Sequence, residues 1–307
     1  MLPINYPSLI KFYTDQQNVL WRAEEIDYSN IRNQWDSISN ERIKRFVEYI
    51  LALFSQIDNI VCENIMTNFY CETEFKEAKA FLVIQSYIET VHSFVYSQSI
   101  FECIRDEKKR NKLLNSVLFF DSVQSITIWV KSYMNRDIPY LERIIGFICL
   151  EGVIFVGLFV SFYWLKSKNM LDAITTANEF ISRDEAIHVN FGIELYKLTC
   201  MRRKIKLSDK QIHGIIHNCV NIASNFIHES LPVAVDNISA ESVISYIKCA
   251  ADNICKELDI NSMYNIKHTC EWMKLILLNN KVNFFEHQVT VYSKNNIEHK
   301  LQLLDEF

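Results

Sequence analysis

Glycine and proline are scarce in this 307-residue chain, which contains only 5 Gly and 4 Pro. Tight turns and phosphate-binding loops depend on these two residues. The composition therefore disfavours turn-rich sheets, glycine-rich nucleotide-binding loops and collagen-like repeats. Long helices joined by short loops fit it better.

Long runs of positive charge are also missing. The net charge is -5, and the densest basic cluster is the short segment MRRKIK at residues 201–206. A solvated loop between helices accounts for such a cluster. We expect no binding to nucleic acid, because nucleic-acid-binding domains carry larger basic patches.

The cysteines show no pairing pattern. Nine are scattered along the chain, and none belongs to a Cys-x-x-Cys motif. An odd, unpatterned set in a long chain indicates reduced thiols. The first residues also lack the basic start and the apolar run of a signal peptide. The predicted location is the cytoplasm, or the host cytoplasm for a viral source.

One apolar run, IIGFICLEGVIFVGLFVSFYWL at residues 144–165, is long enough to span a bilayer. It contains a single charged residue, Glu151, and an ionised carboxylate inside lipid is costly. The sequence has no second segment of this kind. We expect a buried core helix and no stable membrane insertion.

The sequence is rich in apolar residues that recur at helical spacing. Hydrophobic residues make up 49% of it and aromatic residues 13%, enough for a large core. Helices are predicted from Asn40 to about Ile65, and near residues 74–103, 113–134, 139–165, 171–200, 208–231 and 239–258. Ser208 and Ser239 are the expected N-caps of the last two. The predicted fold class is all-α.

These helices turn carboxylates and imidazoles toward the apolar interior. In sequence order the set is Asp58, Glu89 with His92, Glu151, and Glu185 with His188. In each Glu-x-x-His pair the spacing puts both side chains on one helix face, where they reach one metal ion. Four carboxylates neutralise two divalent cations in a low-dielectric core. Oxygen and imidazole ligands without thiolate suit iron or manganese.

The order of these residues resembles the ligand set of ferritin-like di-iron bundles. One Glu-x-x-His pair alone is a weak signal, since surface pairs arise by chance in helix-rich proteins. A rival pair, His213 and His217, lacks the glutamate of a His-Glu-x-x-His zinc site, and we predict that it is solvated or packed. The predicted architecture is a ferritin-like helical bundle with a di-metal carboxylate core.

Five blocks of the sequence closely resemble the small subunit of class I ribonucleotide reductase. They are LWRAEEIDYS, YIETVHSFVYS, LEGVIFVGLF, FISRDEAIHVNF and VNFFEHQV. The resemblance implies an N-terminal lead-in (residues 1–36), a ferritin-like di-iron domain (37–280) and a flexible tail (281–307). It also implies a homodimer that works with a separate large subunit.

The resemblance implies two iron ions per chain, with manganese as the alternative. One ion would be held by Asp58, Glu89 and His92, and the other by Glu151, Glu185 and His188.

Tyr96 matches the tyrosine that carries the family's stable radical. Phe155, Phe159 and Ile181 match the apolar shell around it. Such a shell makes physical sense, because a phenoxyl radical survives only where water and reductants are kept out.

Trp21 and Asp184 match the inner end of the family's long-range radical path. Asp184 would hydrogen-bond the outer nitrogen of His92 and so orient this ligand. Tyr292 matches the tail tyrosine that hands the radical to the large subunit.

The last five residues, LLDEF at 303–307, resemble the acidic tail that docks to the large subunit. Leu303 and Phe307 give this segment its apolar ends, and short apolar anchors commonly enter grooves on partner proteins.

The resemblance thus implies an oxidoreductase subunit of ribonucleoside-diphosphate reductase that makes a tyrosyl radical with O₂. The large subunit would bind the substrate and form deoxyribonucleotides for DNA replication. The ligand pattern alone leaves three other classes open. These are another di-metal oxidase or desaturase, a ferritin-like iron store, and a non-enzymatic helical or membrane protein.

Overall fold

The computed structural model describes residues 2–273, except for the side chains of Asp58 and Asn59. Within these residues helices dominate and no β-strand forms, so the all-α prediction is confirmed. The α-helices are α1 (Pro7–Asn18), α2 (Ile31–Ser37), α3 (Glu41–Asn64), α4 (Tyr70–Glu72), α5 (Lys76–Cys103), α6 (Glu107–Val117), α7 (Asp121–Ser132), α8 (Tyr140–Cys149), α9 (Phe155–Ser167), α10 (Asp172–Arg203), α11 (Asp209–Ser230) and α12 (Ala240–Glu257). A 3₁₀ turn, η1 (Ala23–Glu25), and two π-helical segments, η2 (Ile65–Phe69) and η3 (Leu150–Ile154), complete the set.

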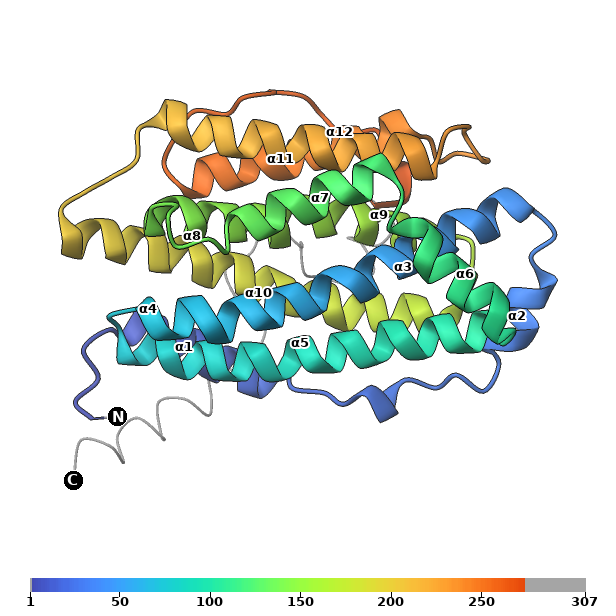
Figure 1. The fold of residues 1–307 in the computed structure, drawn as a ribbon, viewed down its shortest axis with the longest axis horizontal. Helices are drawn as coiled ribbons and strands as arrows, with labels where there is room; N and C mark the ends of the chain where they lie inside the picture. The colour runs from blue at the N-terminus through green and yellow to red at the C-terminus, as the bar shows by residue number, and fades with distance from the viewer. Residues whose placement is uncertain (1, 274–307) are drawn as a thin grey trace.

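The long helices run along the long axis of the molecule (Figure 1). α11 and α12 lie along one side and α3 and α5 along the other, with α8 and α9 between them. α5 packs against α3 and α10, and α10 packs against η3. The elements that carry the predicted metal ligands are therefore neighbours in the centre of the bundle.

The helix N-termini follow the local sequence closely. Ser208 accepts a hydrogen bond from the backbone N–H of Gln211, and Ser239 accepts one from that of Ser242. Both predicted N-caps are confirmed, and both belong to capping boxes. Asn40 caps α3 in the same way.

α8, η3 and α9 form one apolar rod, Tyr140–Ser167, which is long enough to cross a membrane. Its most apolar 18-residue window has a mean hydropathy of 2.4, and all of that window is buried inside the protein. The rod is the expected core helix, and a helix that is apolar all round needs such surroundings. A Cβ atom on Gly152 would lie 2.9 Å from Ile254, and one on Gly157 would lie 2.6 Å from Ile247. These glycines therefore let α12 pack closely against the rod.

The single helix predicted at residues 113–134 is wrong, because two helices, α6 and α7, occupy this region and bend by 65° between them. On a straight helix the buried positions of the two halves would point about 150° apart. The bend lets both sets face the core. The buried apolar residues of the two halves are Leu113 and Val117 in α6, and Val123, Ile126, Trp129 and Val130 in α7.

The predicted N-terminal lead-in does not stand apart from the bundle, since α1 packs against α5 and α10. The predicted boundaries of the lead-in, the helical domain and the tail stay predictions. The tail (281–307) lies outside the described residues. The cytoplasmic location also stays a prediction.

A partly buried ion pair joins the buried Arg143, at the start of α8, to the half-buried Glu72 of α4. Arg143 is 2% exposed, and its Nη1 donates to Glu72 Oε1 at 2.8 Å while Nη2 donates to the other carboxylate oxygen. The Arg143 hydrogen bonds hold the pKa of Glu72 below its usual value. Arg143 Nε also donates to the carbonyl of Ile138, at 3.0 Å.

We predict that Glu72→Gln lowers the free energy of unfolding by about 2 kcal/mol, because it leaves a buried guanidinium without its carboxylate. Since the folded state lowers the pKa of Glu72, this stabilisation is fully present above the ordinary value of 4.5 and is lost as the pH falls below it. Urea denaturation at several pH values measures the difference from the unmutated protein.

The matched control is Asp36→Asn, which breaks the exposed Arg32–Asp36 pair of α2. We expect it to change the free energy of unfolding by less than about 1 kcal/mol. A Glu72→Gln variant as stable as this control would contradict the role given to the partly buried pair.

Candidate metal centre

Glu89, Glu151, Glu185 and His188 converge in the centre of the bundle. Each offers one ligand atom, and these atoms all lie within 4.8 Å of one another. Glu89 comes from α5, Glu151 from the π-helical segment η3, and the other two residues from α10. All four are at most 1% exposed. Helical i, i+3 spacing brings Glu185 and His188 to the same face of α10.

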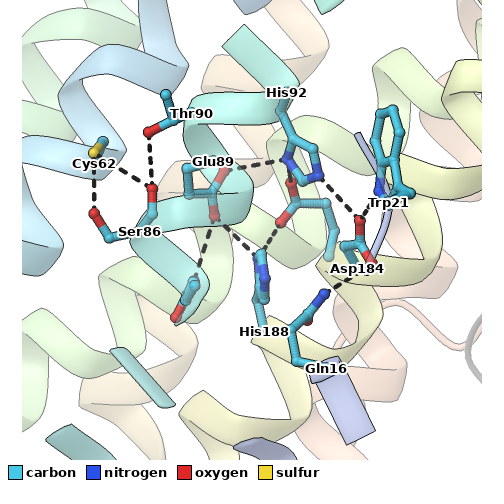
Figure 2. Close-up of polar contacts among 11 residues, drawn as sticks. Gln16, Trp21, Cys62, Ser86, Glu89, Thr90, His92, Asp184 and His188 are labelled. Atoms are coloured by element: carbon cyan, nitrogen blue, oxygen red, sulfur yellow. Dashed lines mark hydrogen bonds and ion pairs between the residues drawn. The ribbon is translucent and has the colours of Figure 1, made fainter. Parts of the chain in front are cut away.

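Glu89 lies between the imidazoles of His92 and His188 (Figure 2), and Glu185 contacts the same two rings. The two oxygens of Glu89 lie 3.3 Å from His92 Nδ1 and 3.0 Å from His188 Nδ1. Those of Glu185 lie 3.1 Å and 2.8 Å from the same two nitrogens. Each carboxylate thus contacts both imidazoles. The Nδ1 atom of each ring faces the carboxylate oxygens.

The charges in this cluster shift the pKa of its members. Burial disfavours a charged imidazole, but the hydrogen bonds and charges of the carboxylates outweigh it. They raise the pKa of His188 to about 9 and that of His92 well above its usual value. Burial likewise disfavours a charged Glu185, but the two imidazoles hold its pKa far below the usual range. The cluster therefore attracts positive charge.

The donor set fits a metal centre. Ionised carboxylates removed from water are stable only beside compensating positive charge. Glu89 Oε2 and His92 Nδ1 are buried 3.3 Å apart, and neither makes a well-aligned hydrogen bond to any described residue. A cation between them would use both atoms. Oxygen and imidazole donors suit iron or manganese.

A hydrogen-bonded path leads from His92 toward α1. His92 Nε2 lies 3.2 Å from Asp184 Oδ2, and the same oxygen accepts a hydrogen bond from Trp21 Nε1 at 2.7 Å. The other oxygen, Oδ1, accepts one from Gln16 Nε2 at 3.0 Å. All four residues are at most 4% exposed. The outer nitrogen of His92 therefore faces Asp184, which fixes the orientation of the ring.

Tyr96 lies one turn beyond His92 on α5 and is 3% exposed. Its ring stacks on that of Phe54, with centroids 4.3 Å apart and an angle of 7° between the planes. The Phe54 ring also contacts those of Phe155 and Phe159, at 5.3 Å and 5.4 Å. Ile181 is 1% exposed. Phe54 of α3 thus covers one face of Tyr96, and two aromatic rings from α9 pack against Phe54.

Two of the predicted site residues fall outside what the structure describes. The backbone of Asp58 lies in α3, which packs against α5, but its side chain is not among the described ones. Tyr292 and the docking segment 303–307 follow the last described residue. Their roles stay predictions.

The rival histidine pair makes separate contacts. His213 Nε2 lies 2.8 Å from the carbonyl of Asn261, and His217 Nδ1 lies 3.1 Å from the hydroxyl of Tyr264. Each imidazole is engaged by the segment that follows α12. The sequence predicts that the pair is solvated or packed, and these contacts agree with that prediction.

Residues 1–271 match the family model "Ribonucleotide reductase, small chain". The protein is 34% identical over 299 residues to the ribonucleoside-diphosphate reductase small subunit of Plasmodium falciparum (isolate FCR-3 / Gambia), with 97% of this sequence and 91% of that one covered. It is also 34% identical over 297 residues to the small subunit of Dictyostelium discoideum, with 97% and 87% covered. The protein belongs to the ribonucleotide reductase small-chain family.

The fold of this small subunit has solved counterparts. The structure of the ribonucleotide reductase Rnr4 homodimer from Saccharomyces cerevisiae matches with a TM-score of 0.80 at 24% identity, over 92% of this chain and 89% of that one. The predicted ferritin-like helical fold and the predicted enzyme class, a ribonucleoside-diphosphate reductase small subunit, are confirmed. The roles of individual residues stay predictions.

Three buried residues adjoin the site although the sequence pattern did not assign them to it. Phe54 stacks on Tyr96, and its position one helical turn before Asp58 was an available signal. Gln85 lies one turn before Glu89, with Nε2 at 3.5 Å from its carboxylate. Gln16 is 168 residues away from its partner Asp184, so no local pattern points to it.

We predict that metal uptake by this small subunit releases protons. With a pKa raised to about 9, His188 is protonated at neutral pH in the metal-free protein, whereas a ligand imidazole must offer a lone pair. The apparent affinity for Fe(II) or Mn(II) should therefore rise with pH up to about 9. Anaerobic titration calorimetry in buffers of different ionisation enthalpy counts the protons.

His217→Ala is the control, because this exposed imidazole contacts Tyr264 far from the cluster along the sequence. It should leave both affinity and proton release unchanged. Metal affinity that does not vary with pH would contradict the raised pKa of His188.

Proposed function

We propose that this small subunit generates a radical on Tyr96 with the help of a di-metal centre and passes it to a large subunit. The large subunit would use it to reduce ribonucleoside diphosphates. The observation that carries this proposal is the position of Tyr96, one turn beyond His92 on the same helix and inside a buried aromatic shell.

Two cations are proposed because Glu89 and Glu185 each contact both His92 and His188. One ion would be held by Asp58, Glu89 and His92, and the other by Glu151, Glu185 and His188. When bound, iron or manganese supplies the redox chemistry that activates O₂ and removes an electron from Tyr96.

The protein's own part is to hold Tyr96 where it is oxidised and to protect the product. Phe54 covers one face of the phenol, and Phe155 and Phe159 pack behind Phe54. Ile181 adds an aliphatic side chain from α10. This packing excludes water and small reductants, so a radical on Tyr96 would persist.

The proposed exit path runs from His92 through Asp184 to Trp21. Its two contacts, 3.2 Å and 2.7 Å, join three buried side chains from α5, α10 and the segment after α1. Beyond Trp21 the proposal relies on Tyr292 and on docking of residues 303–307 to the large subunit. Both lie past the last described residue.

We predict that Tyr96→Phe abolishes the radical and leaves metal binding intact, because phenylalanine keeps the ring but has no hydroxyl to lose a proton. Electron paramagnetic resonance on protein loaded anaerobically with Fe(II) and then exposed to O₂ tests this. Tyr163→Phe is the matched control, since Tyr163 is also buried but bonds to Ser182. A tyrosyl signal that survives in Tyr96→Phe, or is lost only in the control, would contradict the assignment of the radical to Tyr96.

We also propose that a second copy of this protein covers the outer face of α5. Val83, Tyr87, Phe94 and Phe101 are exposed, and their spacing places them on one side of the helix. An exposed apolar stripe of this length favours a protein partner. The S. cerevisiae structure with this fold is described as a homodimer.

We predict that Phe94→Glu converts the dimer to monomers, because it places a charge on the most exposed residue of the stripe, which is 67% accessible in the single chain. Sedimentation velocity measures the change in mass. Phe119→Glu, at another highly exposed position between α6 and α7, is the control and should leave the dimer intact. Dimers that persist in Phe94→Glu would exclude this face.

A further inference from the structure

Gln16 adjoins the proposed radical path without belonging to it. It lies on α1 and is fully buried, and its Nε2 donates to Asp184 Oδ1 at 3.0 Å. The opposite oxygen, Oδ2, accepts from Trp21 at 2.7 Å and lies 3.2 Å from His92 Nε2. The two oxygens of Asp184 therefore have separate partners, with Oδ1 held by Gln16 and Oδ2 shared by Trp21 and His92 (Figure 2).

We propose that Gln16 is a positioning residue that fixes the carboxylate plane of Asp184 and thereby the hydrogen bond between Asp184 and Trp21. Its importance for radical transfer rests on the function proposed above. Its effect on the Trp21 hydrogen bond does not rest on that function, because Gln16, Asp184 and Trp21 contact one another directly through their side chains.

Rotation of the Asp184 carboxylate is the motion that Gln16 would restrain. The torsion about Cβ–Cγ of an aspartate is broad, so contacts and not the covalent geometry set the plane of the carboxylate. Trp21 lies in a non-helical segment between α1 and η1. Gln16 instead belongs to a helix that packs against both α5 and α10. Of the two residues that donate hydrogen bonds to Asp184, Gln16 is therefore held more rigidly than Trp21.

Packing alone does not account for a glutamine at this position. A carboxylate only accepts hydrogen bonds, so the amide must turn its N–H₂ group toward Asp184. Its Oε1 atom is then left buried without a hydrogen-bond partner among the described residues. An apolar side chain of similar length would fill the same space with no unpaired acceptor. Burying the unpaired Oε1 atom costs free energy, and the hydrogen bond from Nε2 to Asp184 has to offset this cost.

The nearest charged donor does not take this role. Arg183 Nη2 lies 3.6 Å from Asp184 Oδ1, beyond hydrogen-bonding distance, and it donates to the carbonyl of Val19 at 2.8 Å. A guanidinium at this distance contributes charge but no hydrogen bond, so Gln16 is the hydrogen-bond donor that holds Oδ1.

The first test uses the metal-free, full-length protein with ¹⁵N-labelled tryptophan. The protein has five Trp residues. The indole N–H signal that disappears in the Trp21→Phe variant is the signal of Trp21. In Gln16→Met, which keeps the side-chain length but removes the donor, we expect exchange of the Trp21 indole hydrogen to accelerate about tenfold. The signals of the other four indoles should stay in place.

Gln17→Met is the matched control, because Gln17 is the next residue of α1 and is exposed. It should leave all five indole signals unchanged. Gln16→Leu is a second variant that lacks any donor, which keeps the test decisive if Gln16→Met does not fold. Unchanged exchange of the Trp21 indole in the folded variant would overturn the positioning role.

The second test measures the Tyr96 radical and turnover in the same variants. After loading with Fe(II) and exposure to O₂, the radical signal should match that of the unmutated protein. Turnover with the large subunit should fall about tenfold or more. Full turnover despite an altered Trp21 signal would overturn the role in transfer. An unmutated protein without any radical would instead refute the proposed function, while indole exchange would still decide whether Gln16 positions Asp184.

Discussion

Compensation of buried charge at Glu89 and Glu185 is the constraint on which the rest of the structure depends. Both carboxylates lie between the imidazoles of His92 and His188, where water is excluded. Carboxylates at this depth destabilise a fold unless positive charge lies beside them. The raised pKa of His188 means that protons on the imidazoles supply part of that charge in the metal-free protein. Metal ions would supply it in the loaded protein, so protons and metal compete for one site.

This constraint explains why α5 is apolar on two sides. Its inner face carries Glu89, His92 and Tyr96 into the core, where apolar neighbours must exclude water. Its outer face carries the exposed stripe that includes Phe94. A helix of this kind is stable only when both faces are covered. The metal site and the proposed contact between two copies of the protein thus lie on opposite sides of one helix.

Periodicity and spacing were sufficient to predict most of the helices and the convergence of Glu89, Glu151, Glu185 and His188, because both follow from helix geometry. The structure added features set by contacts between distant segments. The bend between α6 and α7 depends on which sides of the two helices face the core. The π-helical segment at Glu151 depends on packing against α10, α11 and α12, which no local pattern encodes. The contact between Gln16 and Asp184 likewise joins residues 168 positions apart.

Asp184 connects the metal cluster to Trp21 through a single carboxylate. A change of charge at His92 is therefore felt at Asp184 Oδ2, the same atom that accepts the indole hydrogen bond of Trp21. In a low-dielectric interior such series of hydrogen bonds polarise one another. The amide of Gln16 fixes the geometry of this carboxylate, which gives a physical reason for a buried glutamine at this position.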